Sequence, residues 1–155
     1  MSKMERTAWV SLIVEGGVAL YYFSAIFAMG PDVSLHSGVM AILIGKVIML
    51  AIILGIVMEV IMAGIIRRER DKVPQDERDS LISAKSYRNG YFVLAVGCAS
   101  IIGYVVLSAS GGRAWWITEI LDLTPVYAAH LLLLSMMLSS GVINASRIFY
   151  YRRGY

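Results

Sequence analysis

Five side chains that ionise or form strong hydrogen bonds lie inside long apolar runs of the sequence. Charged groups within a membrane span cost several kcal/mol, and they mark functional sites or buried pairs. The carboxylates of Glu15 and Glu59 fall at a similar depth, about two turns from one side of the membrane, so together they could bind a cation or carry a proton. The alternative is that each carboxylate hydrogen-bonds a neighbouring Ser, Tyr or Asn and only helps the helices to pack. The candidate intramembrane polar site comprises Glu15, Lys46, Glu59, His130 and Asn144.

The three other members of this candidate site carry weaker signals. Lys46 lies in the outer half of its run, where a lysine side chain commonly extends to the lipid headgroups. His130 also lies in the outer half and is typical of an interfacial polar residue, whereas Asn144 shares the depth of the carboxylates. Their spacing matches neither HExxH nor a paired Glu-x-x-His site. We therefore expect no metal site, no cofactor and no catalytic residue.

A second polar group lies between the second and third apolar runs. The acidic residues Asp76, Glu77 and Asp79 follow Pro74 and are typical of the first turn of a helix. They have no basic residue four positions ahead, so their partners must come from elsewhere in the fold. We expect these partners to be arginines of 67–70 or of 147–153. The predicted cytoplasmic charged face comprises Asp76, Glu77, Asp79, Lys85, Arg88, Arg147, Arg152 and Arg153.

Four apolar runs must position these groups, and each is long enough to cross a bilayer. The chain has 155 residues, of which 58% are hydrophobic and 16% charged, whereas soluble domains have about 45–50% apolar and about 25% charged residues. Four spans leave no room for a separate soluble catalytic domain, which excludes enzymes built on nucleotide-binding or barrel folds. The runs cover about 8–29, 36–66, 91–109 and 125–148.

The sequence thus predicts a single all-α domain, 1–155, that forms an antiparallel four-helix membrane bundle. A short amphipathic helix is expected in the loop 67–90, before the third span. Lysine and arginine concentrate before the first run, in this loop and at the C-terminus, while the other two loops hold only Arg113. By the positive-inside rule, both termini and the loop are cytoplasmic in a multi-pass inner-membrane protein. The first run is too long for a signal peptide.

Small residues repeat at four-residue spacing in two of the runs, which allows close helix packing. One stripe contains Ala51, Gly55, Glu59 and Ala63, and the other contains Ala95, Ala99 and Gly103. We therefore expect the second and third spans to be the most closely packed pair, although small residues also line oligomer interfaces. Because Glu59 lies on such a stripe, and because charge facing lipid is costly, we expect both carboxylates to face protein.

Three patches of the chain carry a resemblance to a known family. They are Glu5–Leu12, the segment Asp76–Ile82 with Lys85–Arg88 and Tyr91, and Tyr150–Gly154. Together they resemble a family of small bacterial four-helix inner-membrane proteins of unknown function with a DERD-x-x-I cytoplasmic motif. The resemblance implies a cytoplasmic face assembled from all three segments. Some relatives are encoded beside small helix-turn-helix regulators, which fits an accessory role in stress or immunity, an association rather than a physical argument.

Two functional hypotheses follow from these patterns. In the first, the chain is a non-enzymatic accessory, sensory or immunity-like protein that acts through its charged cytoplasmic face. In the alternative, it is a small proton- or cation-coupled transporter that uses Glu15 and Glu59. The chain has no nucleophile elbow, metal-ligand motif or phosphate-binding glycine loop, so we do not expect an enzyme. The expected partners are the lipid bilayer and either a second copy or another membrane or cytoplasmic protein, but no nucleic acid.

Overall fold

The computed structural model describes residues 3–29, 37–69, 77–109 and 125–154, and the elements it shows within these ranges are four long helices. They are α1 (Lys3–Met29), α2 (Gly38–Glu69), α3 (Glu77–Ala109) and α5 (Pro125–Arg153). Each is long and apolar enough to cross a membrane. The predicted all-α, four-span membrane fold is confirmed.

The segment expected to form a short amphipathic helix is part of α3 rather than a separate element. α3 has 33 residues, or about 50 Å of helix, against about 30 Å of hydrocarbon. The stretch between Glu77 and Tyr91 contains no proline, and its single glycine costs only about 1 kcal/mol in a helix interior. The helix therefore continues without a break from its charged first turn into the apolar span.

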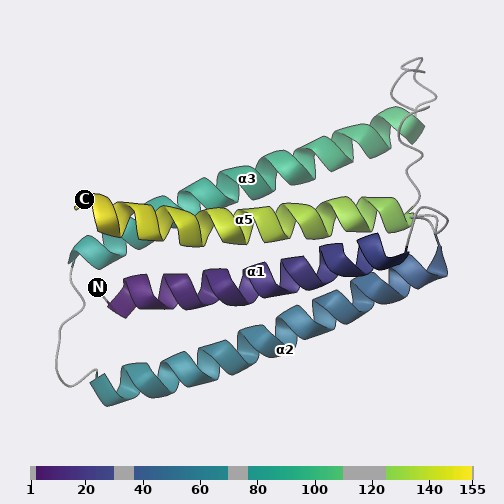
Figure 1. Ribbon diagram of the computed structural model, residues 1–155. Helices are drawn as coiled ribbons and strands as arrows, with labels where there is room; N and C mark the ends of the chain where they lie inside the picture. Colours follow the sequence, from purple (N-terminus) through teal and green to yellow (C-terminus); the bar gives the residue numbers. More distant parts are fainter. Residues whose placement is uncertain (1–2, 30–36, 70–76, 110–124, 155) are drawn as a thin grey trace.

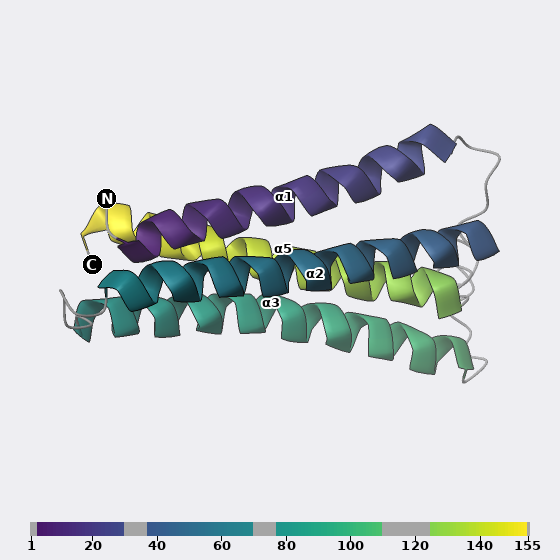
Figure 2. The ribbon, with the colours of Figure 1, turned by 90° about the horizontal axis from the view of Figure 1, so that it is seen from below.

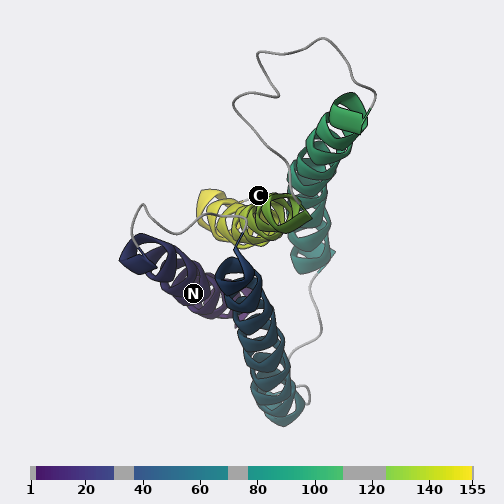
Figure 3. The same ribbon diagram turned by 90° about the vertical axis from the view of Figure 1, so that its right-hand side faces the viewer.

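The four helices run antiparallel, so both chain termini lie at one end of the bundle (Figures 1 and 2). We call this the termini end; α2 finishes there and α3 begins there. α5 contacts each of the other three helices, most extensively α3 and then α1. Viewed along the helices, α1 lies on one side of the bundle, while α2 and α3 diverge from each other (Figure 3).

Two glycines set the close approach of α3 to α5. Gly90 and Gly97 are seven residues apart and so lie on one face of α3. A Cβ atom at Gly90 would lie 2.9 Å from the Ser139 carbonyl oxygen, and one at Gly97 would lie 2.8 Å from the Ser135 Cβ. The Ser139 hydroxyl donates a 2.8 Å hydrogen bond to the Gly90 carbonyl. Only glycine allows the two backbones to come this close.

The prediction that the second and third spans form the most closely packed pair is wrong, because α3 packs most extensively on α5. The described members of both small-residue stripes are exposed in the single chain. They are Ala51, Gly55, Glu59, Ala95, Ala99 and Gly103. Small residues permit close packing, but they do not specify which face of a helix is used.

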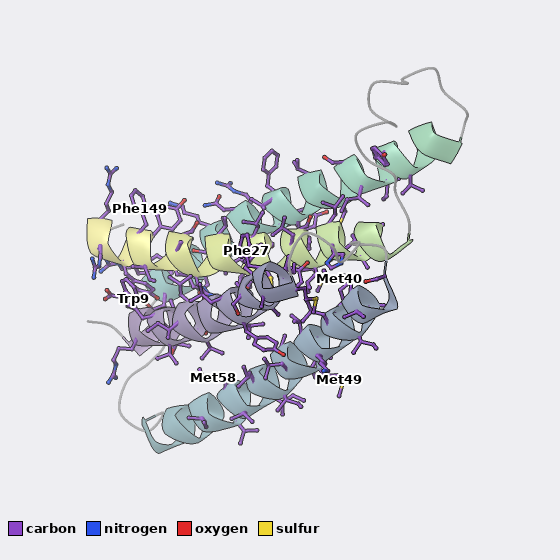
Figure 4. The ribbon with its side chains drawn as sticks, turned by 45° about the vertical axis from the view of Figure 1, so that its right-hand side comes forward. Trp9, Phe27, Met40, Met49, Met58 and Phe149 are labelled. Carbon is purple, nitrogen blue, oxygen red and sulfur yellow. The ribbon has the colours of Figure 1, made fainter. Side chains whose placement is uncertain are left out.

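The apolar core lies where α1, α2 and α5 meet. Val18 and Tyr22 of α1 pack with Met40 and Val47 of α2 and with Leu133 of α5, and all five are buried. The outward side of α2 is apolar as well; Met40 is buried whereas Met49 is 58% exposed (Figure 4). Apolar side chains that point away from the core are expected where lipid covers the helix.

Candidate functional site

Glu15 makes a polar contact between α1 and α5 in the half of the bundle nearer the termini end. Ser140 donates a 2.6 Å hydrogen bond to Glu15 Oε1, and Asn144 Nδ2 lies 3.2 Å from Oε1 and 3.0 Å from Oε2. Glu15 is half-buried and Asn144 is buried. The carboxylate thus has three donor contacts from one neighbouring helix, which are enough to satisfy most of its acceptor capacity.

His130 makes a second polar contact at the same helix pair. Its Nδ1 atom is hydrogen-bonded to the hydroxyl of Tyr22, and both residues are buried. Glu15 and Tyr22 are seven residues apart and lie on one face of α1, so two polar contacts fix the register of α1 on α5. The apolar side chains Val18 and Leu133 are buried at this interface. The two contacts are therefore separate polar positions in one interface.

Lys46 and Glu59 do not join these contacts. Both are exposed on α2, and among the described residues neither has a hydrogen bond or ion pair. The prediction that Glu59 faces protein is wrong for the single chain, because it lies outside the side of α2 that packs on α1 and α5. The five sequence-predicted residues therefore form two separate contacts and two lone charges, and Glu15 and Glu59 do not share a site within one chain.

A shallow cleft opens elsewhere, between α3 and α5. It has a volume of about 250 Å³ and a largely apolar lining that includes Gly97, Ile101, Tyr104 and Leu138. None of the five polar residues lines it. Within the described ranges, no group of three His, Cys, Asp or Glu side chains is placed to hold a metal ion.

The termini end carries a set of polar contacts between α3 and α5. Tyr151 donates a 2.7 Å hydrogen bond to Asp79 Oδ1. Ten residues further along α3, Asn89 Nδ2 donates 3.2 Å hydrogen bonds to the hydroxyls of Ser146 and Tyr150. Lys85 Nζ lies 5.9 Å from the centre of the Tyr150 ring. These contacts join the first four turns of α3 to the last turns of α5.

The expected partner of Asp79 is corrected by this arrangement. The C-terminal segment does supply the partner, but it is the hydroxyl of Tyr151 rather than an arginine. Glu77 is exposed. Asp76 and the side chains of 67–70 lie outside the described residues, so the pairing predicted for them is not tested. A neutral donor satisfies Asp79 and leaves the arginines for other contacts.

The arginines of α5 lie against aromatic rings instead. The Arg147 guanidinium is 4.6 Å from the centre of the Tyr87 ring, and that of Arg153 is 4.8 Å from the Phe149 ring. These distances fall within the range of cation–π attraction, worth about 0.5–1 kcal/mol at exposed sites.

Arg152 connects α5 to α1. It lies 5.4 Å from the Trp9 ring and 3.6 Å from Glu5 Oε1, and Trp9 is found with Phe149 at the termini end (Figure 4). Three helices are thus joined at one end of the bundle. The contacts leave basic side chains exposed there: Arg78, Arg152 and Arg153. Arg88 is exposed as well, but it lies eleven residues into α3, about 17 Å from the start of the helix.

Several residues of these contacts were not singled out from the sequence. They are Tyr22, Asn89, Gly90, Gly97, Ser140 and Ser146. A usable signal exists for some of them, because polar and small residues recur at helical spacing on matching faces of α1, α3 and α5. For the polar pairs, the partner is more than 50 residues away, and nothing in the local sequence identifies it.

Comparison of this chain with family models, with curated protein sequences and with solved structures finds no match.

Proposed function

We propose that this chain is a multi-pass inner-membrane protein of the non-enzymatic accessory or sensory type. Its termini end lies in the cytoplasm and binds the acidic surface of a partner protein. The orientation follows from the distribution of lysine and arginine, which concentrate at the ends of the chain and in residues 67–88, between the apolar parts of α2 and α3. The partner is inferred from charge, because exposed arginines attract and orient acidic surfaces.

The observation that supports this proposal best is the way in which α1, α3 and α5 are joined at the termini end. The contacts of Asp79, Asn89 and Glu5 hold three helix ends in fixed relative positions. A binding surface gains affinity when its side chains are already ordered before the partner arrives. Membrane anchoring alone does not require such contacts outside the apolar spans.

The alternative, transport through a pair of carboxylates, receives less support. Ser140 and Asn144 already supply the hydrogen bonds of Glu15, and Glu59 lies on the exposed side of another helix. A cation or proton shared between them would need a polar route through the bundle. The interface beside Glu15 instead continues into the buried apolar residues Val18 and Leu133.

Photo-crosslinking in cells tests the proposed partner surface. A photoreactive amino acid replaces exposed Ser80 in the first turn of α3, and the control position is exposed Val39 at the opposite end. We expect a discrete protein adduct from position 80 and none from position 39. Arg153→Glu should lower the yield of the adduct about tenfold, whereas Arg153→Lys, which keeps the charge, should retain most of it.

Reconstituted vesicles supply the discriminating measurement. Under the proposal, vesicles that contain the protein hold a proton or Na⁺ gradient as long as empty vesicles do. A flux that Glu15→Gln or Glu59→Gln abolishes would contradict the proposal and support the transporter. Equal crosslinking from positions 80 and 39, or a yield that charge reversal leaves unchanged, would also contradict the proposed surface.

A further inference from the structure

Glu59 and Arg88 occupy matching positions on two helices that do not pack closely on each other. Glu59 lies ten residues before the end of α2 at Glu69, and Arg88 lies eleven residues after the start of α3 at Glu77. At about 1.5 Å per residue, both lie about 15–17 Å from the termini end of their helices. Both side chains are exposed, and neither has a hydrogen bond or ion pair among the described residues.

Small residues continue the helix face on which each charge lies. On α2, Gly55 and Ala51 precede Glu59 by four and eight residues, and all three are exposed. On α3, Ala95 and Ala99 follow Arg88 at seven and eleven residues, and these are exposed as well. Ala51 and Ala95 are each eighteen residues from the termini end of their helix. Glu59 and Arg88 therefore lie at nearly the same distance from the termini end, and so do the small residues Ala51 and Ala95.

The face of Arg88 points away from the rest of its own chain. Arg88 precedes Gly90 by two residues, a rotation of about 200° around the helix, and Gly90 faces α5. Arg88 therefore lies on the side of α3 opposite to α5. It cannot reach Glu59 of the same chain without a rotation of α3 that would remove Gly90 and Gly97 from Ser139 and Ser135.

A second copy of the chain can satisfy both charges at once. α2 and α3 run antiparallel over nearly the same length (Figure 1), and they diverge on the side of the bundle away from α1 (Figure 3). A two-fold axis parallel to the helices places α2 of one copy beside α3 of the other, and the reverse. Both copies keep the same orientation in the membrane. The same contact is then formed twice.

We propose that the chain forms a two-fold symmetric dimer in the membrane, in which Glu59 pairs with Arg88 of the second copy and the small-residue stripes of α2 and α3 form the helix contact. A carboxylate and a guanidinium form the strongest side-chain ion pair, with two parallel hydrogen bonds. Lipid on these faces would leave a carboxylate beside acyl chains, at a cost of several kcal/mol. The opposite charges at equal depth make the surface complementary to itself, which favours a second copy over an unrelated protein. This proposal is independent of the proposed cytoplasmic partner.

Cysteine crosslinking between differently tagged copies tests the helix contact. In a Cys98→Ala background, one copy carries Ala51→Cys and the other carries Ala95→Cys. We expect a disulfide between the two copies in native membranes, and little between two Ala51→Cys copies. Ile53→Cys is the matched control, because it is exposed at nearly the same depth but on another side of α2. It should crosslink poorly to Ala95→Cys.

Charge exchange tests the ion pair. Glu59→Arg or Arg88→Glu alone should lower the dimer fraction about tenfold or more, as counted by single-molecule photobleaching in vesicles, because like charges then meet. The combined change Glu59→Arg with Arg88→Glu should restore the dimer, which also excludes misfolding as the cause. Lys46→Glu, a charge reversal on another side of α2, should have little effect.

Three results would overturn this proposal. The wild-type chain could bleach in single steps at high protein-to-lipid ratio, which would show that it is a monomer. The two cysteines could form a disulfide only when both are on one chain, which would indicate a contact between α2 and α3 of the same copy. A dimer that both single charge reversals leave intact would place the interface elsewhere. None of these results would affect the proposed partner surface, whose test uses Ser80 and Arg153.

Discussion

Tyr151 donates a 2.7 Å hydrogen bond to Asp79, which joins the last turns of α5 to the first turn of α3. The two residues are 72 positions apart in the sequence. The contact lies at the outer limit of the α3–α5 interface, where the helices extend beyond the apolar spans. It fixes the position of a charged first turn that lies beyond the α3–α5 contacts of Lys85, Tyr87 and Asn89.

Removal of this hydrogen bond should loosen the termini end. We expect Tyr151→Phe to lower the free energy of unfolding in detergent by about 1 kcal/mol, since a partly exposed hydrogen bond is worth about this much. Asp79→Ala should cost a similar amount. In a double-mutant cycle the combined change should cost clearly less than the sum of the two. Additive effects would show that the two side chains do not interact in the folded state.

The glycines of α3 should not tolerate a methyl group. Gly90→Ala and Gly97→Ala should each destabilise the protein by about 1–3 kcal/mol, because the new Cβ overpacks against Ser139 or Ser135. Gly103→Ala is the control on the same helix; its Cβ would meet nothing within 4 Å, so it should be neutral or slightly stabilising. Thermal unfolding in detergent measures the difference. Equal effects at all three positions would contradict the close approach.

Glu15 should act as a hydrogen-bond acceptor more than as a charge. Glu15→Gln retains an acceptor for Ser140, so we expect a change in stability below about 1 kcal/mol. Glu15→Leu leaves the donors of Ser140 and Asn144 without their acceptor and should cost about 1–2 kcal/mol. Glu59→Leu is the matched control and should leave the stability of the monomer in detergent nearly unchanged. If Glu15→Gln is as damaging as Glu15→Leu, the charge itself is required.

The orientation in the membrane can be tested with single cysteines in a Cys98→Ala background. Ser80→Cys, near the start of α3, should react with a membrane-impermeant maleimide only after the cells are opened. Val39→Cys, at the opposite end of the bundle, should react in intact spheroplasts. The reverse pattern would place the termini end outside the cell and would remove the basis for a cytoplasmic partner.

The number and extent of the spans could be predicted from the sequence because they depend on local properties. Runs of apolar residues limited by Pro31, by Gly111 and Gly112, and by Pro125 specify where a helix can cross a bilayer. Two of the four helices, α1 and α3, begin well before the apolar run that predicts them, because polar residues can extend a helix beyond the bilayer. α3 begins at Glu77 rather than near 91, since no strong helix breaker separates its charged turns from its span.

The polar sites could not be predicted equally well, because they depend on which faces meet. Glu15 and Glu59 are the same residue type at a similar depth, yet the first packs on α5 and the second is exposed. What separates them is a matching set of polar residues on another helix, which Ser140 and Asn144 provide for Glu15. The small-residue stripes were misleading for the same reason. The seven-residue spacing of Gly90 and Gly97, matched by Ser135 and Ser139, was the stronger signal.

The central position of α5 has a consequence for biosynthesis. It is the last of the four helices to leave the ribosome, although each of the others contacts it. Glu15 and Tyr22 therefore enter the membrane before Ser140, Asn144 and His130 have been translated. The bundle can close only after translation has reached the final helix. A nascent chain arrested before Pro125 would display an uncompensated carboxylate and an unfilled glycine face, features by which membrane proteases and chaperones can distinguish it from the finished protein.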